Sequence, residues 1–470
     1  YKAVITAKDM GRSGKRPKDE LQVGFIGEFE IGEVNKEGQT LKATLSQVPE
    51  VQAAILTINA KTGEIPVMIG GYDYQTSKFN NATQGLRQTG PCFKPFVYTA
   101  AVEFGITEDS IVSGAPIRRG GWMPHNYDGS LSHANVPMKI ALAKSYNLAA
   151  VHLLDQVGIP TGSQMVRRFG ITNPMAPVLP SALGASEVSL IEMVSGYSVF
   201  PNKGVRMEPH LIRKVLDRDG KVLEEWEKTS FKVTNEYVAG TMVDMMRGVV
   251  RGGGTASGAS AGGHPLAGKT GTVNDHTDVW FIGYTPTYAT GVWMGNPLRK
   301  ESLGRGMTGG HGAVPYFNGF MIPFMKDKPR DNFYQTPPMP AEIKALAEQR
   351  KREELEKLEK ADAEGRKLGV VFNTGGTRRS KTGTIVSSSG NSGSSNNSGG
   401  IINPNTSPTS GGDDEPPPTL NTSPRPGNDT TTPKPTAKPT TKPAETPKKV
   451  EPAKTPEGNK KKGKKGDDDP

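Results

Sequence analysis

The sequence contains one cysteine, and only 34% of its 470 residues are hydrophobic. A single cysteine cannot form an intramolecular disulfide, which excludes a small secreted domain held together by disulfides. The histidines are few and scattered, without metal-ligand spacing, so we predict no metal site. No apolar run approaches the ~20 residues that a membrane-spanning helix needs. The low hydrophobic content also predicts that part of the chain does not fold.

The part predicted to be disordered is the C-terminal tail, residues 374–470, which is rich in Ser, Thr, Pro, Gly and Lys. From Lys434 to Pro470 there are 11 Lys against 6 Asp and Glu, a net charge of +5 out of a formal +10 for the chain. One interpretation is an electrostatic tether to a wall polymer, lipid headgroups or nucleic acid. The other, a solubilising spacer, is favoured. Because no aromatic residues lie among the lysines to stack on bases, we expect no nucleic-acid partner.

The start of the chain lacks the features of a complete precursor. It opens at Tyr1 with neither an initiator Met nor a signal peptide, which indicates a fragment or processed product of a longer protein. Changes in composition divide the chain into four predicted regions. These are a partial β-rich linker domain (1–48), the main folded domain (49–327), a charged helix with a connector (328–373) and the tail (374–470).

The main domain mixes segments of strand and helix character. Val51–Ile58 and Ile65–Ile69 flank a turn and predict a β-hairpin. Because strands and helices follow one another without βαβ regularity, the pattern favours an α+β fold. Further along, Ala341–Leu368 predicts a charged helix whose thin apolar stripe leaves it mostly in solvent. Helices are also expected over Phe93–Phe104, Pro137–Val157 and Ser189–Phe200, and two strands over Thr272–Gly291.

The segment Gly263–Thr270 fits the phosphate-loop pattern G-x4-G-K-[ST]. A phosphate loop lies between a buried strand and a helix, whereas here a Gly- and Ser-rich stretch precedes the segment and a β-prone, aromatic stretch follows it. We therefore interpret the match as accidental. The residues Lys269-Thr270-Gly271-Thr272 are better explained as the opening of a β-strand, where Lys and Thr can hold a carboxylate. A second copy, Lys381-Thr382-Gly383-Thr384, falls in the tail and is attributed to chance.

Two further blocks precede this strand. Ser145-Tyr146-Asn147 lies between helical segments, although S-x-N alone is weak evidence because Ser and Asn commonly cap helices. Pro91-Cys92-Phe93-Lys94 has the frame of an S-x-x-K site without its serine. In such a site the first and last residues share one helix face, so that a neutral lysine can take the serine proton.

In this order and at these spacings, the three blocks resemble the transpeptidase domain of class A penicillin-binding proteins. The resemblance covers about Leu45–Phe324 and implies an α+β penicillin-binding transpeptidase fold, like that of the serine β-lactamases. Residues 1–48 resemble the linker ahead of that domain, and we expect a fragment without the family's glycosyltransferase domain and membrane anchor. Other segments similar to the family are Gly70–Asp73, Phe79–Thr83, Phe93–Phe96, Asn126–Gly129, Ala182–Gly184 and Asp278–Tyr284.

The resemblance implies a role in peptidoglycan biosynthesis and cell shape. In the family reaction, a stem peptide ending in D-Ala-D-Ala acylates a serine, and an amine then resolves the acyl-enzyme into a cross-link of the cell wall. β-Lactams trap the same serine. The implied partners are stem peptides, β-lactams and other wall-synthesis proteins, with no cofactor. The implied location is the extracytoplasmic face of the cytoplasmic membrane (periplasm or cell envelope), with membrane association only through a segment outside this chain.

The resemblance also implies roles for individual residues. Lys94 would be the general base for acylation, Ser145 would pass a proton to the departing D-alanine nitrogen, and Asn147 would hold the donor peptide amide. The terminal carboxylate would be fixed by Lys269 and Thr270. Gly271 would allow close approach of the substrate, and Thr272 would line the site and donate its backbone N–H to the oxyanion hole.

The chain departs from the family at the nucleophile, because Pro91 stands where the serine is expected. Proline has no hydroxyl to acylate and no backbone N–H for the other half of the oxyanion hole; losing one such donor alone typically costs ~10²–10³ in rate. Cys92 is the obvious candidate to replace the serine, but it is disfavoured because it is two residues from Lys94, roughly 200° around a helix, and would face away from the lysine amine. A small, buried and unreactive residue is the favoured interpretation of Cys92.

These observations predict a transpeptidase domain that binds its ligands but cannot be acylated. The alternative is a non-catalytic peptidoglycan-binding or scaffold module that recruits wall-synthesis proteins through the linker, the charged helix or the tail. A phosphate-loop nucleotidase is the third and weakest hypothesis, and it requires magnesium-dependent ATP binding.

Overall fold

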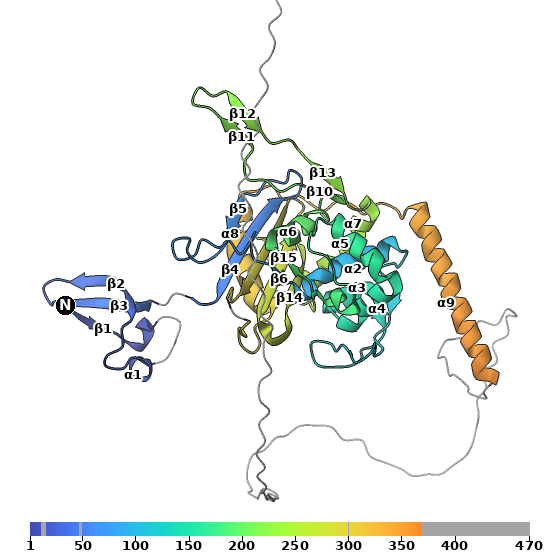
Figure 1. The fold of residues 1–470 in the computed structure, drawn as a ribbon, viewed down its shortest axis with the longest axis horizontal. Helices are drawn as coiled ribbons and strands as arrows, with labels where there is room; N and C mark the ends of the chain where they lie inside the picture. The colour runs from blue at the N-terminus through green and yellow to red at the C-terminus, as the bar shows by residue number, and fades with distance from the viewer. Residues whose placement is uncertain (11–15, 47–48, 299, 368–470) are drawn as a thin grey trace, which may run out of the picture. The chain divides into compact units, whose positions relative to one another are not determined.

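A five-stranded antiparallel sheet lies at the centre of the main domain, with the strand order β14-β15-β16-β4-β5 (Figure 1). The structure is a computed structural model that describes residues 1–10, 16–46, 49–298 and 300–367. The tail predicted at 374–470, including the second Lys-Thr-Gly-Thr copy, lies outside the described residues. The five strands are β4 (Gln52–Asn59), β5 (Val67–Ile69), β14 (Ala267–Thr272), β15 (Asp278–Tyr284) and β16 (Tyr288–Gly295).

Strand β15, which lies between β14 and β16, is buried along its whole length because helices cover both faces of the sheet. Its side chains alternate between two hydrophobic clusters, as the two-residue repeat of a strand requires. Trp280 and Ile282 pack into the larger cluster, whereas Phe281 packs into the smaller one. The larger cluster includes α6 (Leu190–Ser198), and the smaller one includes α8 (Val314–Met325), where Phe317 meets Phe281 edge to face.

A group of helices packs beside the sheet and contributes many residues to the larger hydrophobic cluster. In the centre of this group lies α2 (Lys94–Glu103), whose residues Lys94–Val102 are all buried. It contacts three of its neighbours directly, namely α4, α5 and α7. The surrounding helices are α3 (Met138–Lys144), α4 (Asn147–Val157), α5 (Ile159–Arg168) and α7 (Glu236–Val250).

Short elements connect these larger ones. The two-stranded pairs are β6 (Arg87–Gln88) with β9 (Glu187–Val188), β7 (Ile111–Val112) with β8 (Val136–Pro137), β10 (Val205–Met207) with β13 (Ser230–Lys232), and β11 (Lys214–Leu216) with β12 (Val222–Glu225). The short helical turns are η3 (Gly90–Phe93), η4 (Leu179–Leu183), η5 (Asn274–His276) and the π-helical η6 (Gly309–Ala313).

The N-terminal residues form a small separate sheet of order β1-β3-β2, in agreement with the β-rich character predicted for this region. Its elements are β1 (Lys2–Val4), η1 (Ala7–Asp9), α1 (Pro17–Glu20), β2 (Glu28–Asn35) and β3 (Thr40–Ser46). The predicted boundary at residue 48 falls between this sheet and β4.

Most of the predicted elements are present, with three differences. The hairpin is confirmed as β4 and β5, and the mixture of helices and strands confirms the α+β class. The helix predicted over Pro137–Val157 is instead two helices that meet at Ser145, which adopts a left-handed conformation with φ of 59°. The Lys-Thr-Gly-Thr block forms the last four residues of β14 rather than its opening, because the strand begins at Ala267.

The third difference concerns the charged helix, which is α9 (Ala341–Lys367). The expectation of a solvated helix holds for most of its described side chains, but its N-terminal part is anchored. Ile343 is 6% exposed and joins the larger hydrophobic cluster, and the Arg350 guanidinium lies 3.8 Å from the centre of the Phe104 ring. Among the residues the structure describes, no helix, including α9, combines the length and apolarity needed to cross a bilayer.

Candidate active site

Pro91 lies in the turn η3 that leads into α2. Gly90 has φ of 52°, and Pro91 follows it within the first turn, where proline is readily accommodated, as predicted. The backbone N–H of Lys94 donates to the Pro91 carbonyl, so the two residues lie one turn apart. Pro91 is half-buried, whereas Cys92 and Lys94 are fully buried. The turn therefore places the first and last residues of the Pro91–Lys94 block one helical turn apart.

Ser145 and Asn147 sit where α3 ends and α4 begins. Ser145 terminates α3 by turning left-handed, a conformation that costs a non-glycine residue energy and is common at functional sites. Asn147 opens α4, and its backbone N–H donates to Asn126 Oδ1 at 2.9 Å. Its side-chain Nδ2 donates to the His125 carbonyl at 2.9 Å. The segment around Asn126 thus fixes the Asn147 amide, so that its oxygen faces Lys94.

Lys269 and Gly271 lie on β14, which runs against η3. A β-carbon at Gly271 would overlap the Thr89 carbonyl and lie 3.0 Å from Cys92 Sγ. Only glycine therefore allows β14 to approach η3 this closely. This contact offers a second explanation of Gly271, in addition to the predicted access for substrate.

The four polar side chains predicted from the three blocks meet in one cluster. Lys94 Nζ lies 2.6 Å from the Ser145 carbonyl oxygen, 2.7 Å from Asn147 Oδ1 and 3.3 Å from Ser145 Oγ. Lys269 Nζ donates to Ser145 Oγ at 2.8 Å and to the Thr270 carbonyl at 3.1 Å. The Ser145 hydroxyl therefore lies between the two lysine amines. The structure brings together residues that are 53 and 124 positions apart in sequence.

Burial lowers the pKa of both lysines. Desolvation, followed by the charge of Lys269, lowers the pKa of Lys94 well below its ordinary value. Desolvation lowers the pKa of Lys269 to about 8. Because a charge on Lys269 disfavours a second charge on Lys94, we assign the neutral amine to Lys94 and the charge near neutral pH to Lys269. A neutral amine has two N–H donors for the two nearby carbonyl oxygens and a lone pair for the Ser145 hydroxyl.

The two threonines of the block have different surroundings. Thr270 is 7% exposed, and its hydroxyl lies 2.7 Å from the Thr255 hydroxyl. Thr272 is half-buried, and its Oγ accepts a hydrogen bond from the Gly309 backbone N–H at 3.0 Å. The π-helix η6 therefore supports the end of β14.

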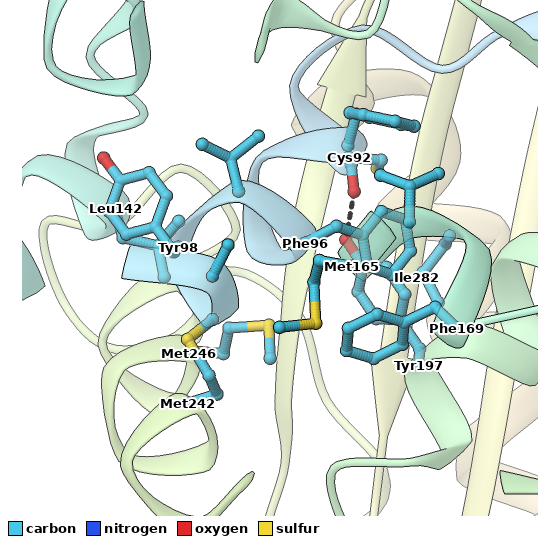
Figure 2. Packing of buried hydrophobic residues seen from close by; sticks show 14 of the residues in the cluster. Cys92, Phe96, Tyr98, Leu142, Met165, Phe169, Tyr197, Met242, Met246 and Ile282 are labelled. Carbon is cyan, nitrogen blue, oxygen red and sulfur yellow. Dashed lines mark hydrogen bonds between the residues drawn. The ribbon is translucent and has the colours of Figure 1, made fainter. Parts of the chain in front are cut away.

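Cys92 points into the hydrophobic core (Figure 2). Its Sγ lies 3.3 Å from the Lys269 carbonyl oxygen, and its own carbonyl accepts a hydrogen bond from the Tyr197 hydroxyl at 2.6 Å. Desolvation raises the pKa of the thiol to about 12. The prediction of a small, buried residue at this position is confirmed.

We expect the Cys92 thiol to resist modification in the native protein. Its full burial and raised pKa leave almost no accessible thiolate at pH 8, and the thiolate is the reactive form. Iodoacetamide should label the native chain at least ~100-fold more slowly than the chain unfolded in guanidinium chloride, as followed by intact mass. Equal labelling rates would show that Cys92 is accessible and restore it as a candidate nucleophile.

Gly184 holds the turn η3 in place, and we expect Gly184→Ala to destabilise the protein strongly. Gly184 has φ of 78°, and a β-carbon there would overlap the backbone of Gly90, directly before Pro91. The left-handed conformation alone should cost about 1–2 kcal/mol, and the overlap should raise the total loss in unfolding free energy to about 3 kcal/mol or more. The measurement is denaturant unfolding.

Gly220→Ala is the matched control for this substitution. Gly220 has φ of 83°, yet nothing lies within 4 Å of a β-carbon built there. Its loss should therefore stay at the conformational cost, about 1–2 kcal/mol. Equal losses for the two variants would mean that the turn η3 can shift to accommodate the methyl group added at position 184.

The phosphate-loop pattern does not form a phosphate loop. Lys269 lies inside the buried strand β14 and is followed by η5 and another strand, whereas that motif needs its lysine at the start of a helix. Sequence reasoning did not single out Thr255, because it lies in a Gly- and Ser-rich stretch without periodicity. It included Asn126 only as part of a family-like segment, not as the residue that fixes Asn147.

Comparison with known proteins identifies the family of the chain. The penicillin-binding protein transpeptidase domain matches residues 53–321, more than half of the chain. The chain therefore belongs to this family. It is 37% identical over 297 residues to penicillin-binding protein 1A of Aquifex aeolicus, covering 62% of this chain and 40% of the relative. It is 38% identical over 299 residues to penicillin-binding protein 1A of Neisseria gonorrhoeae, covering 60% of this chain and 37% of that relative. The chain thus spans about two-fifths of the length of these relatives.

Solved structures support the same fold. The crystal structure of penicillin-binding protein 1A from Haemophilus influenzae aligns with a TM-score of 0.63 and 26% identity, covering 70% of this chain and 55% of that chain. The penicillin-binding protein PonA1 of Mycobacterium tuberculosis aligns with a TM-score of 0.57 and 24% identity, covering 63% of this chain and 84% of that chain. The α+β penicillin-binding transpeptidase fold is therefore established for the main domain.

Proposed function

We propose that this chain keeps the ligand-binding site of a peptidoglycan D,D-transpeptidase but cannot form the acyl-enzyme. The observation that carries the proposal is the intact cluster of Lys94, Ser145, Asn147 and Lys269 beside Pro91. The cluster offers a positive charge for a carboxylate and an amide for a peptide group. What it lacks is an atom that can attack a carbonyl carbon.

The roles follow from the contacts. The charged Lys269 and the Thr270 hydroxyl bind the terminal carboxylate of a D-Ala-D-Ala peptide or of a β-lactam, and the Asn147 amide binds the peptide group. In a relative with serine at position 91, the neutral Lys94 would accept the hydroxyl proton as the oxygen bonds to the carbonyl carbon. The Ser145 hydroxyl, between the two lysines, would then give its proton to the leaving nitrogen and recover one from a lysine. Here the first of these steps has no hydroxyl to start from.

Location and wider role belong to the same proposal. The family and the relatives named penicillin-binding protein 1A support a place in cell-wall synthesis, at the extracytoplasmic face of the membrane. Stem peptides and β-lactams are the proposed ligands. Because the chain matches only 40% of the Aquifex relative, the proposal covers the transpeptidase domain and not the complete activity of that protein.

The alternative, a non-catalytic binding or scaffold module, differs in where its affinity resides. On the main proposal, affinity for D-Ala-D-Ala peptides belongs to the Lys269 cluster. On the alternative, affinity for wall fragments would be lost when residues after 373 are deleted. The cluster favours the main proposal. Burying two lysines beside a left-handed serine costs stability, so this arrangement indicates a functional role.

The test is to measure reversible and covalent binding on the same protein. Calorimetric titration with a peptide ending in D-Ala-D-Ala should show saturable binding, whereas mass spectrometry after incubation with a penicillin should show no adduct. Lys269→Met should weaken this binding roughly 30-fold or more, and deletion of residues 374–470 should not change it. Loss of affinity on deletion, with Lys269→Met unaffected, would favour the scaffold alternative.

A further inference from the structure

We infer that Thr255 is a positioning residue that orients the Thr270 hydroxyl toward the ligand's carboxylate. The inference rests on the proposed function, because it assigns Thr270 a carboxylate to bind. Among the residues that the structure describes, the Thr255 hydroxyl bonds to Thr270 and not to the cluster of Lys94, Ser145, Asn147 and Lys269. Its effect on the ligand is therefore transmitted through Thr270.

Thr255 is held in place by several elements that are distant in sequence. Its backbone N–H donates to the Ala143 carbonyl in α3 at 3.3 Å, and the next N–H, of Ala256, donates to the Val249 carbonyl in α7 at 2.9 Å. A β-carbon at Gly310 in η6 would lie only 2.8 Å from the Thr255 carbonyl oxygen. The backbone at Thr255 is therefore fixed between α3, α7 and η6, and its hydroxyl lies 2.7 Å from the Thr270 hydroxyl.

The bond between the two hydroxyls has a direction that a ligand can select. A hydroxyl has one hydrogen to donate and two lone pairs to accept with. Within the described part of the chain, Thr270 Oγ forms a hydrogen bond only with Thr255 Oγ. When the Thr270 hydrogen points at Thr255, none remains for a ligand. When the Thr255 hydroxyl donates instead, the Thr270 hydrogen is free.

A carboxylate favours the second arrangement because it can only accept hydrogen bonds. With Thr270 donating to the carboxylate, its own lone pairs need a donor, and Thr270 is only 7% exposed to water. Thr255 supplies that donor. A C-terminal amide carries N–H donors of its own and does not require the Thr270 hydroxyl to donate. The contribution of Thr255 should therefore be specific to carboxylate ligands.

The experiment compares two ligands and four variants of the full chain. The ligands are a peptide ending in D-Ala-D-Ala and the same peptide with a C-terminal amide, titrated by calorimetry. Thr255→Val removes the hydroxyl at nearly constant shape and should weaken the carboxylate peptide about fivefold to tenfold, with the amide peptide changed less than about twofold. Thr255→Ser keeps the hydroxyl and should stay within about twofold of the wild type.

A double-mutant cycle with Thr270→Val separates positioning from direct contact. If Thr255 acts through Thr270, Thr255→Val should have no further effect once the Thr270 hydroxyl is gone. Additive losses would overturn the inference and place Thr255 in direct contact with the ligand. Equal losses for both peptides, or no loss in Thr255→Val, would also overturn it.

The outcome for the wild type distinguishes this inference from the proposal it rests on. A wild-type chain that binds neither peptide, or binds both equally, would show that the proposed function fails, and the inference with it. A wild type that prefers the carboxylate, with Thr255→Val unchanged, would leave the proposed function standing and reject Thr255 alone. Thermal unfolding of each variant checks that the fold is kept.

Discussion

Pro91→Ser is expected to turn the chain into one that is acylated by penicillin. The hydrogen bond from the Lys94 N–H to the residue 91 carbonyl places position 91 one turn before a buried amine of strongly lowered pKa. Serine would supply both the missing hydroxyl and the missing backbone N–H. Acylation should rise by a factor on the order of 10⁴ or more, from no detectable adduct to one penicillin per chain in the intact mass.

Two controls separate the contributions to this gain. Pro91→Ala restores the N–H without a hydroxyl and should give no adduct. Adding Lys94→Met to Pro91→Ser leaves a hydroxyl without its base, and acylation should fall by about 10²–10⁴-fold. A Pro91→Ser chain that folds and binds the peptide but forms no adduct would mean that more than the nucleophile has been lost.

Affinity for the D-Ala-D-Ala peptide is expected to fall as pH rises above about 8, the pKa of Lys269. Burial favours the neutral amine, whereas the ligand's carboxylate favours the ammonium, so binding requires Lys269 to take up a proton wherever it is neutral in the free protein. The binding constant should drop about tenfold per pH unit above that pKa, and roughly 30-fold between about pH 7 and pH 9.5. The measurement is calorimetric titration across this range.

Two neighbouring groups should not contribute to this profile. Burial and the charge of Lys269 lower the pKa of Lys94, so we expect no proton uptake by Lys94, and the pKa of about 12 keeps the Cys92 thiol neutral over the same range. Lys269→Met should therefore flatten the profile and bind roughly 30-fold or more weakly at neutral pH. The amide peptide should show a flat profile with the wild type. An unchanged slope in Lys269→Met would assign the proton to another group.

Much of the fold could be predicted because its signals are local. The apolar and β-branched residues of Val51–Ile58 and the turn after them predict the β4–β5 hairpin, and the capping box in which Ser189 accepts from the Glu192 N–H marks the start of α6. The three motif blocks gave the members of the cluster, because their residue types and order are specific together.

The features that could not be predicted depend on tertiary contacts. The break between α3 and α4 requires a left-handed residue, and that residue is Ser145 rather than a glycine, so the sequence carries no signal for it. The start of β14 at Ala267 depends on pairing with Tyr284, and the anchoring of Ile343 depends on a core assembled far away in sequence. Thr255 lies in a stretch typical of a loop, and only the packing of α3, α7 and η6 around it brings its hydroxyl to Thr270.

The most direct test of a site that binds but does not react is one sample of the wild-type chain measured in two ways. Calorimetry with a peptide ending in D-Ala-D-Ala should give saturable binding that a penicillin competes away. The intact mass after prolonged incubation with that penicillin should equal the mass before it. A stable adduct on any residue of the site, or turnover of the peptide, would contradict the account.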